Sequence, residues 1–215
     1  TYQLNEGTKS TNYAITKVCG NLTVTPVKEK VTVTITGHSR AEKYDGEEYT
    51  VSGYEIAADN SLYETSNVQF NGAKDSATGK NAGSYTTKLN AAEFVNTNEN
   101  FANVTFVIQN DIVLTVQKRA VTLTSANDSK VYDGTPLTNS EITVGGDGFA
   151  NGEGATYEVT GTQTTAGTSD NTFNYILNAG TNADNYEISK HEGKLIVTAT
   201  KDEVVVTITE QSGSF

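Results

Sequence analysis

Two Tyr-Asp-Gly tripeptides carry the carboxylates that would first be suspected of chemistry, Tyr44-Asp45-Gly46 and Tyr132-Asp133-Gly134. Glycoside hydrolysis needs two carboxylates that face each other across one site. The two tripeptides are 88 residues apart (132 − 44 = 88) and each follows a Thr-alternating apolar run, so they are equivalents in two repeats. We therefore expect each Asp to cap its own turn, each Gly to adopt a positive φ and each Tyr to pack on a sheet.

Three other sets of residues could bind metals or anions. The glycine-rich stretch 145–154 offers oxygen ligands but lacks the ligand spacing of a calcium loop and a helix that would bind phosphate, so a hairpin turn is favoured. His38 and His191 have no neighbouring Cys or second His, and Cys19 falls at a predicted turn, where we expect an exposed thiol. We predict no cofactor and no metal site, with calcium at acidic contacts between modules as the weaker alternative.

Composition excludes several classes of protein. The chain has 215 residues, of which 35% are hydrophobic and 19% charged, too apolar for a disordered chain, and it has no apolar run long enough to span a bilayer. A formal net charge of -11 argues against nucleic acid as a partner. One Cys cannot form an internal disulfide, and the polar first residues without a signal peptide suggest an internal piece of a longer chain.

Internal repeats organise the sequence. Residues 12–36 match residues 185–209 without gaps at 14 of 25 positions, with an offset of 173 (185 − 12), close to twice 88. A more diverged copy begins at Phe101, which is 88 residues after Tyr13. A fixed period of this kind predicts tandem modules. The predicted boundaries are 1–30 for the closing hairpin of a preceding repeat, 31–118 and 119–201 for two modules, and 202–215 for the first strand of a following repeat.

Short alternating segments predict strands throughout and no amphipathic helix. The Tyr-Asp-Gly turn is expected between the first and second strands of each module, and the two last strands, as in 13–17 and 22–25, are expected to form a hairpin. One helical turn is expected at 90–94. We predict an all-β, mainly antiparallel fold in which two β-sandwich or β-grasp-like modules are stacked into an elongated rod by short, charged connectors. Further segments expected to be strands are 49–56, 68–70, 82–89, 104–108, 112–116, 142–144, 156–160 and 172–177.

Several motifs together resemble a known family. They are 130–137 (Lys-Val-Tyr-Asp-Gly-Thr-Pro-Leu), 151–153, Ala166-Gly167-Thr168, 185–190 and 193–198, with variant counterparts that include Gly83-Ser84-Tyr85. The chain resembles the YDG-type repeat modules, akin to the mostly β-grasp (MBG-like) modules, of large surface proteins of Gram-positive bacteria. The resemblance implies an extracellular, cell-wall-anchored adhesin or stalk whose partners are neighbouring modules of the same chain, with no catalytic residues.

Sugar binding is the main alternative function. The chain has 11 Tyr, and aromatic rings stack on sugars while Asn and Asp donate and accept hydrogen bonds. However, Tyr13, Tyr44, Tyr132 and Tyr186 recur at equivalent repeat positions, which favours a packing role. Binding of a glycan, mucin or host protein by the modules themselves therefore stays the second hypothesis. A Lys–Asn isopeptide cross-link, which needs a buried acid beside the pair, also stays open.

Overall fold

The computed structural model describes residues 1–201 and 203–209, and its regular structure is almost wholly β. The predicted all-β fold class is confirmed. Helical structure in the described residues is limited to single 3-10 turns, including the turn expected at 90–94, where the Asn90 side chain accepts a hydrogen bond from the Ala92 N–H. No helix in this part of the chain is long and apolar enough to cross a membrane.

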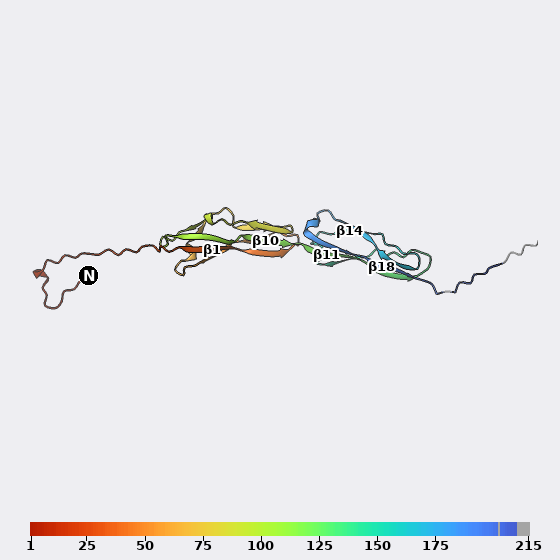
Figure 1. Cartoon of the computed structure of the whole chain (residues 1–215), viewed down its shortest axis with the longest axis horizontal. Coiled ribbons are helices and arrows are strands. Elements are labelled where there is room, and N and C mark those ends of the chain that lie inside the picture. Colours follow the sequence, from red (N-terminus) through yellow and green to blue (C-terminus); the bar gives the residue numbers. More distant parts are fainter. Residues whose placement is uncertain (202, 210–215) are drawn as a thin grey trace, which may run out of the picture.

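The strands fall into two groups, and within the described residues no strand pair joins one group to the other. We call residues 31–117 the first unit and residues 119–198 the second unit. Figure 1 shows the two units following one another along the longest axis of the chain. The first unit contains β1 (Val31–Gly37), β2 (Ser39–Lys43), β3 (Tyr49–Ser52), β4 (Tyr54–Ala58), β5 (Val68–Phe70), β6 (Ser76–Gly79), β7 (Gly83–Thr87), β8 (Phe94–Asn96), β9 (Val104–Asn110) and β10 (Ile112–Gln117). The second contains β11 (Arg119–Ser125), β12 (Asp128–Val131), β13 (Ile142–Gly146), β14 (Ala155–Val159), β15 (Gly167–Asn171), β16 (Phe173–Leu177), β17 (Tyr186–His191) and β18 (Gly193–Thr198).

Both units repeat the same sheet topology. Each has two three-stranded mixed sheets, ordered β4-β1-β9 and β2-β10-β7 in the first unit, and β13-β11-β17 and β12-β18-β15 in the second. The opening strands pair in parallel with the closing strands, and the other pairs are antiparallel. The predicted closing hairpin is therefore wrong. Consecutive strands β17 and β18 lie in different sheets, because each pairs with an opening strand of its unit rather than with its neighbour in sequence.

The chain changes sheets where two backbones approach closely. Only His38 separates β1 from β2, and only Asp111 separates β9 from β10. A Cβ added to Gly37 would lie 2.5 Å from the Asp111 carbonyl carbon, so only glycine fits there. The second unit places the glycine on the opposite strand, where a Cβ on Gly193 would lie 2.4 Å from the Ala126 oxygen. The same crossing is thus built twice from different residues.

One hydrophobic cluster runs through both units. Alternate residues of β1 are fully buried, as its Val-Thr repeat predicts, and β10 and β11 contribute in the same way. Each such side chain stabilises the fold by about 1.5–3 kcal/mol through removal from water. The cluster includes Tyr44 of the first unit and Ala150 and Tyr186 of the second, so the buried apolar surface continues where the units meet. A separate small cluster at the far end contains Leu137, Leu195 and Val197.

The segments before and after the two units form no strands within the described residues. Residues 13–25, expected to form a hairpin, are extended and exposed, with Tyr13, Leu22 and Val24 among the exposed side chains. Their counterparts β17 and β18 pair with opening strands, and no such strand lies beside 13–25, which explains the difference. Residues 203–209, expected to begin a further first strand, are also unpaired in secondary structure, and residues 202 and 210–215 lie outside the described part.

Most of the remaining strand predictions are confirmed, with three corrections. The segment 49–56 is two strands in different sheets, because Gly53 has a φ of 84° and breaks the extended run. The Tyr-Asp-Gly turns follow β2 and β12, so they come after the second strand of each unit rather than the first. The glycine-rich stretch is not a hairpin turn, since β13 pairs with β11 and β14 with β16.

Candidate functional site at the contact between the two units

The two Tyr-Asp-Gly turns have the same local structure. Asp45 Oδ1 accepts the N–H of Glu47 at 2.9 Å, and Asp133 Oδ1 accepts the N–H of Thr135 at 2.9 Å. Gly46 has a φ of 91° and Gly134 a φ of 81°, where a side chain would be strained. Each carboxylate thus holds its own turn, and the structure does not bring the two aspartates together.

The two tyrosines have the same backbone anchor but different surroundings. Tyr44 donates its N–H to Gln117 O at 2.9 Å, and Tyr132 donates its N–H to Thr198 O at 2.8 Å. Tyr44 is 2% exposed because the second unit covers it, whereas Tyr132 is 44% exposed. The ring of Tyr44 packs edge-on against Tyr186, with ring centroids 5.6 Å apart at 85°. This pair forms the centre of the inter-unit contact.

Glu153 joins the two tyrosine hydroxyls. Tyr44 Oη donates to Glu153 Oε1, and Tyr186 Oη donates to Glu153 Oε2 at 2.7 Å. The Tyr186 hydroxyl also accepts the Ala150 N–H at 3.0 Å. Burial, followed by the hydrogen bond to Glu153, raises the pKa of Tyr186 to about 12. The same two causes raise the pKa of Tyr44, so both phenols stay neutral donors at physiological pH.

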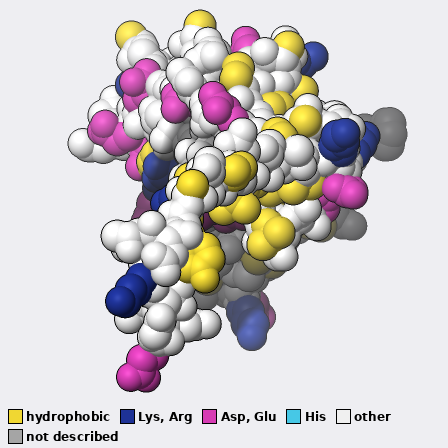
Figure 2. Space-filling model, turned by 90° about the vertical axis from the view of Figure 1, so that its left-hand side faces the viewer, with side chains coloured by type: hydrophobic (Ala, Val, Ile, Leu, Met, Phe, Trp, Pro, Cys, Tyr) yellow, Lys and Arg dark blue, Asp and Glu magenta, His cyan; other side chains and the backbone are white. Residues whose placement is uncertain are grey.

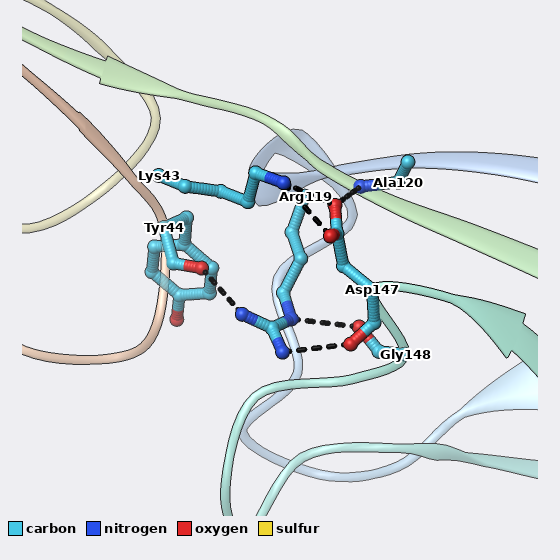
Figure 3. Close-up of polar contacts among 6 residues, drawn as sticks. All are labelled: Lys43, Tyr44, Arg119, Ala120, Asp147 and Gly148. Carbon is cyan, nitrogen blue, oxygen red and sulfur yellow. Dashed lines mark hydrogen bonds and ion pairs between the residues drawn. The ribbon is translucent and has the colours of Figure 1, made fainter.

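Arg119, the first residue of β11, forms a second connection between the units (Figure 3). Its guanidinium donates to Gly148 O at 2.8 Å, to Asp147 O at 2.7 Å and, across the contact, to Tyr44 O at 3.3 Å. The Asp147 carboxylate accepts two hydrogen bonds of 2.8 Å from Lys43 of the first unit and one of 3.3 Å from the Ala120 N–H. The Lys43 hydrogen bond is the main reason that the pKa of Asp147 is lowered.

Asn185 connects a third pair of segments. Its side chain is buried, accepts the Ala82 N–H at 2.8 Å through Oδ1 and donates from Nδ2 to Asn81 Oδ1 at 3.1 Å. Residues 81–82 come immediately before β7, so the contact ties the loop of the first unit to the 3-10 turn that precedes β17. Because the amide is removed from water and satisfied on both sides, it fixes the relative position of the two loops.

The remaining predicted residues lie at matched structural positions. Gly83 begins β7 and pairs with Val116, while Gly167 begins β15 and pairs with Val197. Tyr186 belongs to the inter-unit contact, whereas its sequence counterpart Tyr13 is exposed. Cys19 is an exposed free thiol, as predicted. In the described residues, no group of three or more His, Cys, Asp or Glu side chains could hold a metal ion.

The contact holds the two units together through a buried aromatic pair and hydrogen bonds. Its carboxylates, Asp147 and Glu153, are engaged by Lys43 and by two tyrosine hydroxyls. Sequence reasoning identified Tyr44 and Tyr186 but missed Arg119, Asp147, Glu153 and Asn185. The signal available was weak: 151–153 and 185–190 belong to the recurring motifs, but only the fold shows that they face the preceding unit. Comparisons of the chain with family models, curated proteins and solved structures find no match.

Proposed function

We propose that this chain is a non-catalytic structural segment of a bacterial cell-surface, adhesin-like protein, in which tandem modules stack into a rod that projects distal domains. The observation that carries the proposal is the burial of Tyr44 beneath the second unit. Its hydroxyl donates a hydrogen bond to Glu153 of that unit, and its backbone carbonyl accepts one from Arg119 of that unit. A spacer needs its modules to resist bending, and buried aromatic and hydrogen-bonded contacts oppose hinge motion.

The short connection between the units supports the same function. Lys118 alone lies between β10 and β11, so the chain has almost no length over which to bend. Hydrogen bonds from Lys43, Arg119 and Asn185 then cross the contact to three different partners. A negative net charge of -11 keeps neighbouring copies apart in solution, which suits a segment that acts as a spacer.

Small-angle X-ray scattering of the whole chain tests the mechanical part of this proposal. We expect an extended profile whose maximum dimension is unchanged by added salt, because the contact does not depend on exposed charges alone. Tyr44→Ala is expected to broaden the distance distribution by allowing the units to bend. A compact profile for the unmodified chain would contradict the proposal. Labelling of intact source cells by antibodies against this chain tests the surface location.

Glycan binding is the second candidate, and a specific hollow favours it. A depression of about 190 Å³ on the β14–β16 ribbon is lined by Tyr157, Tyr175, Glu158 and Asn174, among others. Tyr157 and Tyr175 are directly opposite each other in the antiparallel register, so their rings lie on one face. Aromatic rings are surfaces on which sugars stack, while Glu158 and Asn174, the next pair in the register, lie on the other face of the ribbon.

A glycan array and a mucin-binding assay on the 215-residue chain separate the two candidates. Saturable micromolar binding that is abolished by Tyr175→Ala would favour the glycan function, while Tyr132→Ala, in the turn after β12 and away from the ribbon, is the matched control. No binding to either set of ligands is expected if the chain is a spacer.

A further inference from the structure

The end of the second unit that faces away from the first carries an exposed copy of the surface that the inter-unit contact buries. A hollow of about 260 Å³ there is lined by Tyr132, Thr165, Ala166, Ala199 and Thr200, which we call the distal face. Tyr132 and Tyr44 each donate an N–H to the last strand of their unit, at Thr198 and Gln117. Because this hydrogen bond is shared, the five residues of the distal face can be matched to residues of the inter-unit contact. In the order given above they correspond to Tyr44, Asn81, Ala82, Lys118 and Arg119.

The opposite end of the first unit carries the other half of such a contact. Phe101 forms a parallel β-bridge with Val27, just as Tyr186 pairs in parallel with Arg119. The ring of Tyr63 packs edge-on against Phe101, with centroids 5.1 Å apart. Phe149 packs in the same way against Tyr186, at 5.2 Å. A hollow of about 460 Å³ at this end is lined by residues that include Val27, Leu62, Glu64, Asn100 and Phe101, which we call the proximal face. Figure 2 looks at the molecule from this end, where residues 1–30 extend toward the viewer, and shows hydrophobic side chains near the middle with many charged ones toward the outline.

The two exposed faces differ from the buried contact in a coordinated way. Val131, which is 58% exposed, stands where the first unit has Lys43, and Thr200 stands where it has Arg119. On the proximal face the partners of those cations are also replaced. Alignment of Tyr63 with Phe149 puts Ser61 in the place of Asp147, and Leu62, which is 74% exposed, in the place of Gly148. Compared with the buried inter-unit contact, the distal face therefore lacks two cations and the proximal face lacks the carboxylate that bonds to one of them. Each face instead has one exposed apolar side chain, Val131 or Leu62.

The sequence after the second unit has the character of the first unit. Residues 204–209 (Val-Val-Val-Thr-Ile-Thr) match residues 31–36 at five of six positions, but match residues 121–126 at only two of six. The residues that lead into this stretch, 200–203, correspond to 27–30, which lead into the first unit. Both ends of the described chain thus indicate that first-type and second-type units alternate.

We propose that the distal face of the second unit is a docking surface for a further unit of the first type, and that it discriminates against a unit of the second type. The Tyr132 ring enters the hollow over Phe101 of the incoming unit, whose own ring is only 6% exposed, and Asn100 takes the role of Asn185 by accepting the Ala166 N–H. The alignment counterpart of Glu153 is Asn67, and Glu64, which lines the same hollow, is the carboxylate that accepts the Tyr132 hydroxyl. A second-type unit would instead place Asp147 beside Val131, where it keeps its own Arg119 and the Ala120 N–H but loses the ion pair that Lys43 makes across the present contact. The inference rests on the stacking in the proposed function but not on a cell-surface location.

Two extended chains test this specificity. In the first, residues 1–209 are followed by a second copy of residues 37–118, which makes the third unit first-type. In the second, residues 1–199 are followed by residues 119–201, which makes it second-type with the same spacing as the Lys118–Arg119 junction. Amide hydrogen exchange is measured at Ala166 and at Tyr132. We expect at least tenfold slower exchange at Ala166 in the first-type chain than in the 215-residue chain, and less slowing in the second-type chain.

Equal exchange at Ala166 in the 215-residue and first-type chains would overturn the proposal, as would equal slowing by both kinds of third unit. Exchange within the added strands shows whether the third unit has folded. If it has not, the faces are tested between separate copies of the Cys19→Ser chain. A spin label on Thr164→Cys, beside the distal face, is expected to broaden the Leu62 and Asn100 amide signals of a second, isotope-labelled copy at millimolar concentration. Absence of broadening there overturns the proposal, while a compact scattering profile of the unmodified chain would count against the proposed function instead.

Discussion

Tyr44 and Tyr132 each begin a Tyr-Asp-Gly tripeptide, follow equivalent strands and donate equivalent backbone hydrogen bonds. Tyr44 is nevertheless buried, whereas Tyr132 is exposed. The difference does not arise within the turn, because both aspartates accept an N–H two residues later and both glycines have positive φ. It arises from what covers the ring. A second unit lies over Tyr44, and no described unit lies over Tyr132.

This comparison separates two roles that the tripeptide combines. Asp and Gly form the turn in both units. The Tyr ring packs against a neighbouring unit only in the first turn, at Tyr44, and is exposed in the second, at Tyr132. The ring of Tyr44 contributes apolar burial, a T-shaped contact with Tyr186 and a hydrogen bond to Glu153. If the comparison is right, changes at Tyr44 cost much more stability than identical changes at Tyr132.

Tyr44→Ala is expected to have the largest effect. Truncation removes a buried aromatic ring at the inter-unit contact and leaves the Glu153 carboxylate with one fewer donor, so we expect a loss of about 3–5 kcal/mol in the free energy of unfolding. Tyr132→Ala is the matched control and is expected to cost under about 1 kcal/mol, since its ring is 44% exposed. Urea denaturation followed by circular dichroism measures both, and equal losses would contradict the comparison.

Glu153→Gln is expected to have the next largest effect. The amide replaces one carboxylate oxygen by an NH2 group, so one of the Tyr44 and Tyr186 hydroxyls loses the oxygen atom that now accepts its hydrogen bond. We expect a loss of about 1.5–3 kcal/mol in the free energy of unfolding, the range for hydrogen bonds to charged groups. The control is Glu187→Gln on the exposed face of β17, expected to be near neutral. A double mutant of Glu153→Gln with Tyr44→Phe should lose less than the sum of the single losses, and full additivity would exclude the coupled network.

Alkaline pH provides a graded way to weaken the same contact. The pKa of Tyr186 is raised from 10.0 to about 12, and the pKa of Tyr44 is also raised. Above pH 10 the unfolded state loses its phenolic protons first, so stability that is complete below pH 10 is lost as pH rises toward 12. The loss is on the order of 2 kcal/mol for Tyr186. Chemical denaturation between pH 8 and 11.5 measures this loss. If the decrease of the free energy of unfolding with pH were the same in Tyr186→Phe, the raised pKa of Tyr186 would not be its cause.

The sequence predicts the fold class well because strand periodicity is local. The Val-Thr alternation of β1 predicts one buried face, and the Asp-Gly dipeptides predict the turns that Asp45 and Asp133 hold. Strand pairing is not local, and there the prediction failed. The last two strands, β17 and β18, are adjacent in sequence, and Gly193 lies where the second of them begins. A glycine between two consecutive strands suggests a hairpin. Gly193 is instead required because its strand crosses Ala126 at close range, a fact that depends on the fold.

The candidate site shows the same limit more strongly. Repetition predicted packing roles for four tyrosines, since Tyr44 recurs as Tyr132 and Tyr13 as Tyr186. The structure buries Tyr44 and Tyr186, but it leaves Tyr13 and Tyr132 exposed, so the prediction is wrong for that pair. Nothing in the repeat indicates that the glycine-rich stretch containing Asp147 and Glu153 reaches the preceding unit, because it is long and has no close counterpart in the first unit. The short, polar strands β2 and β12 were also missed, since neither has an alternating apolar pattern that would mark it as a strand.

Lys43→Val gives the smallest expected effect and the sharpest comparison of the two turns. It gives the first unit the residue that precedes Tyr132 and removes the ion pair with Asp147, whose members are both partly exposed. We expect a loss of about 0–1 kcal/mol in the free energy of unfolding that shrinks further in high salt, because exposed pairs are screened. Asp147 keeps the Ala120 N–H and the neighbouring Arg119 guanidinium, so the second unit should stay docked, with unchanged scattering. A loss as large as that of Tyr44→Ala would mean that the ion pair, and not the buried tyrosine, holds the two units together.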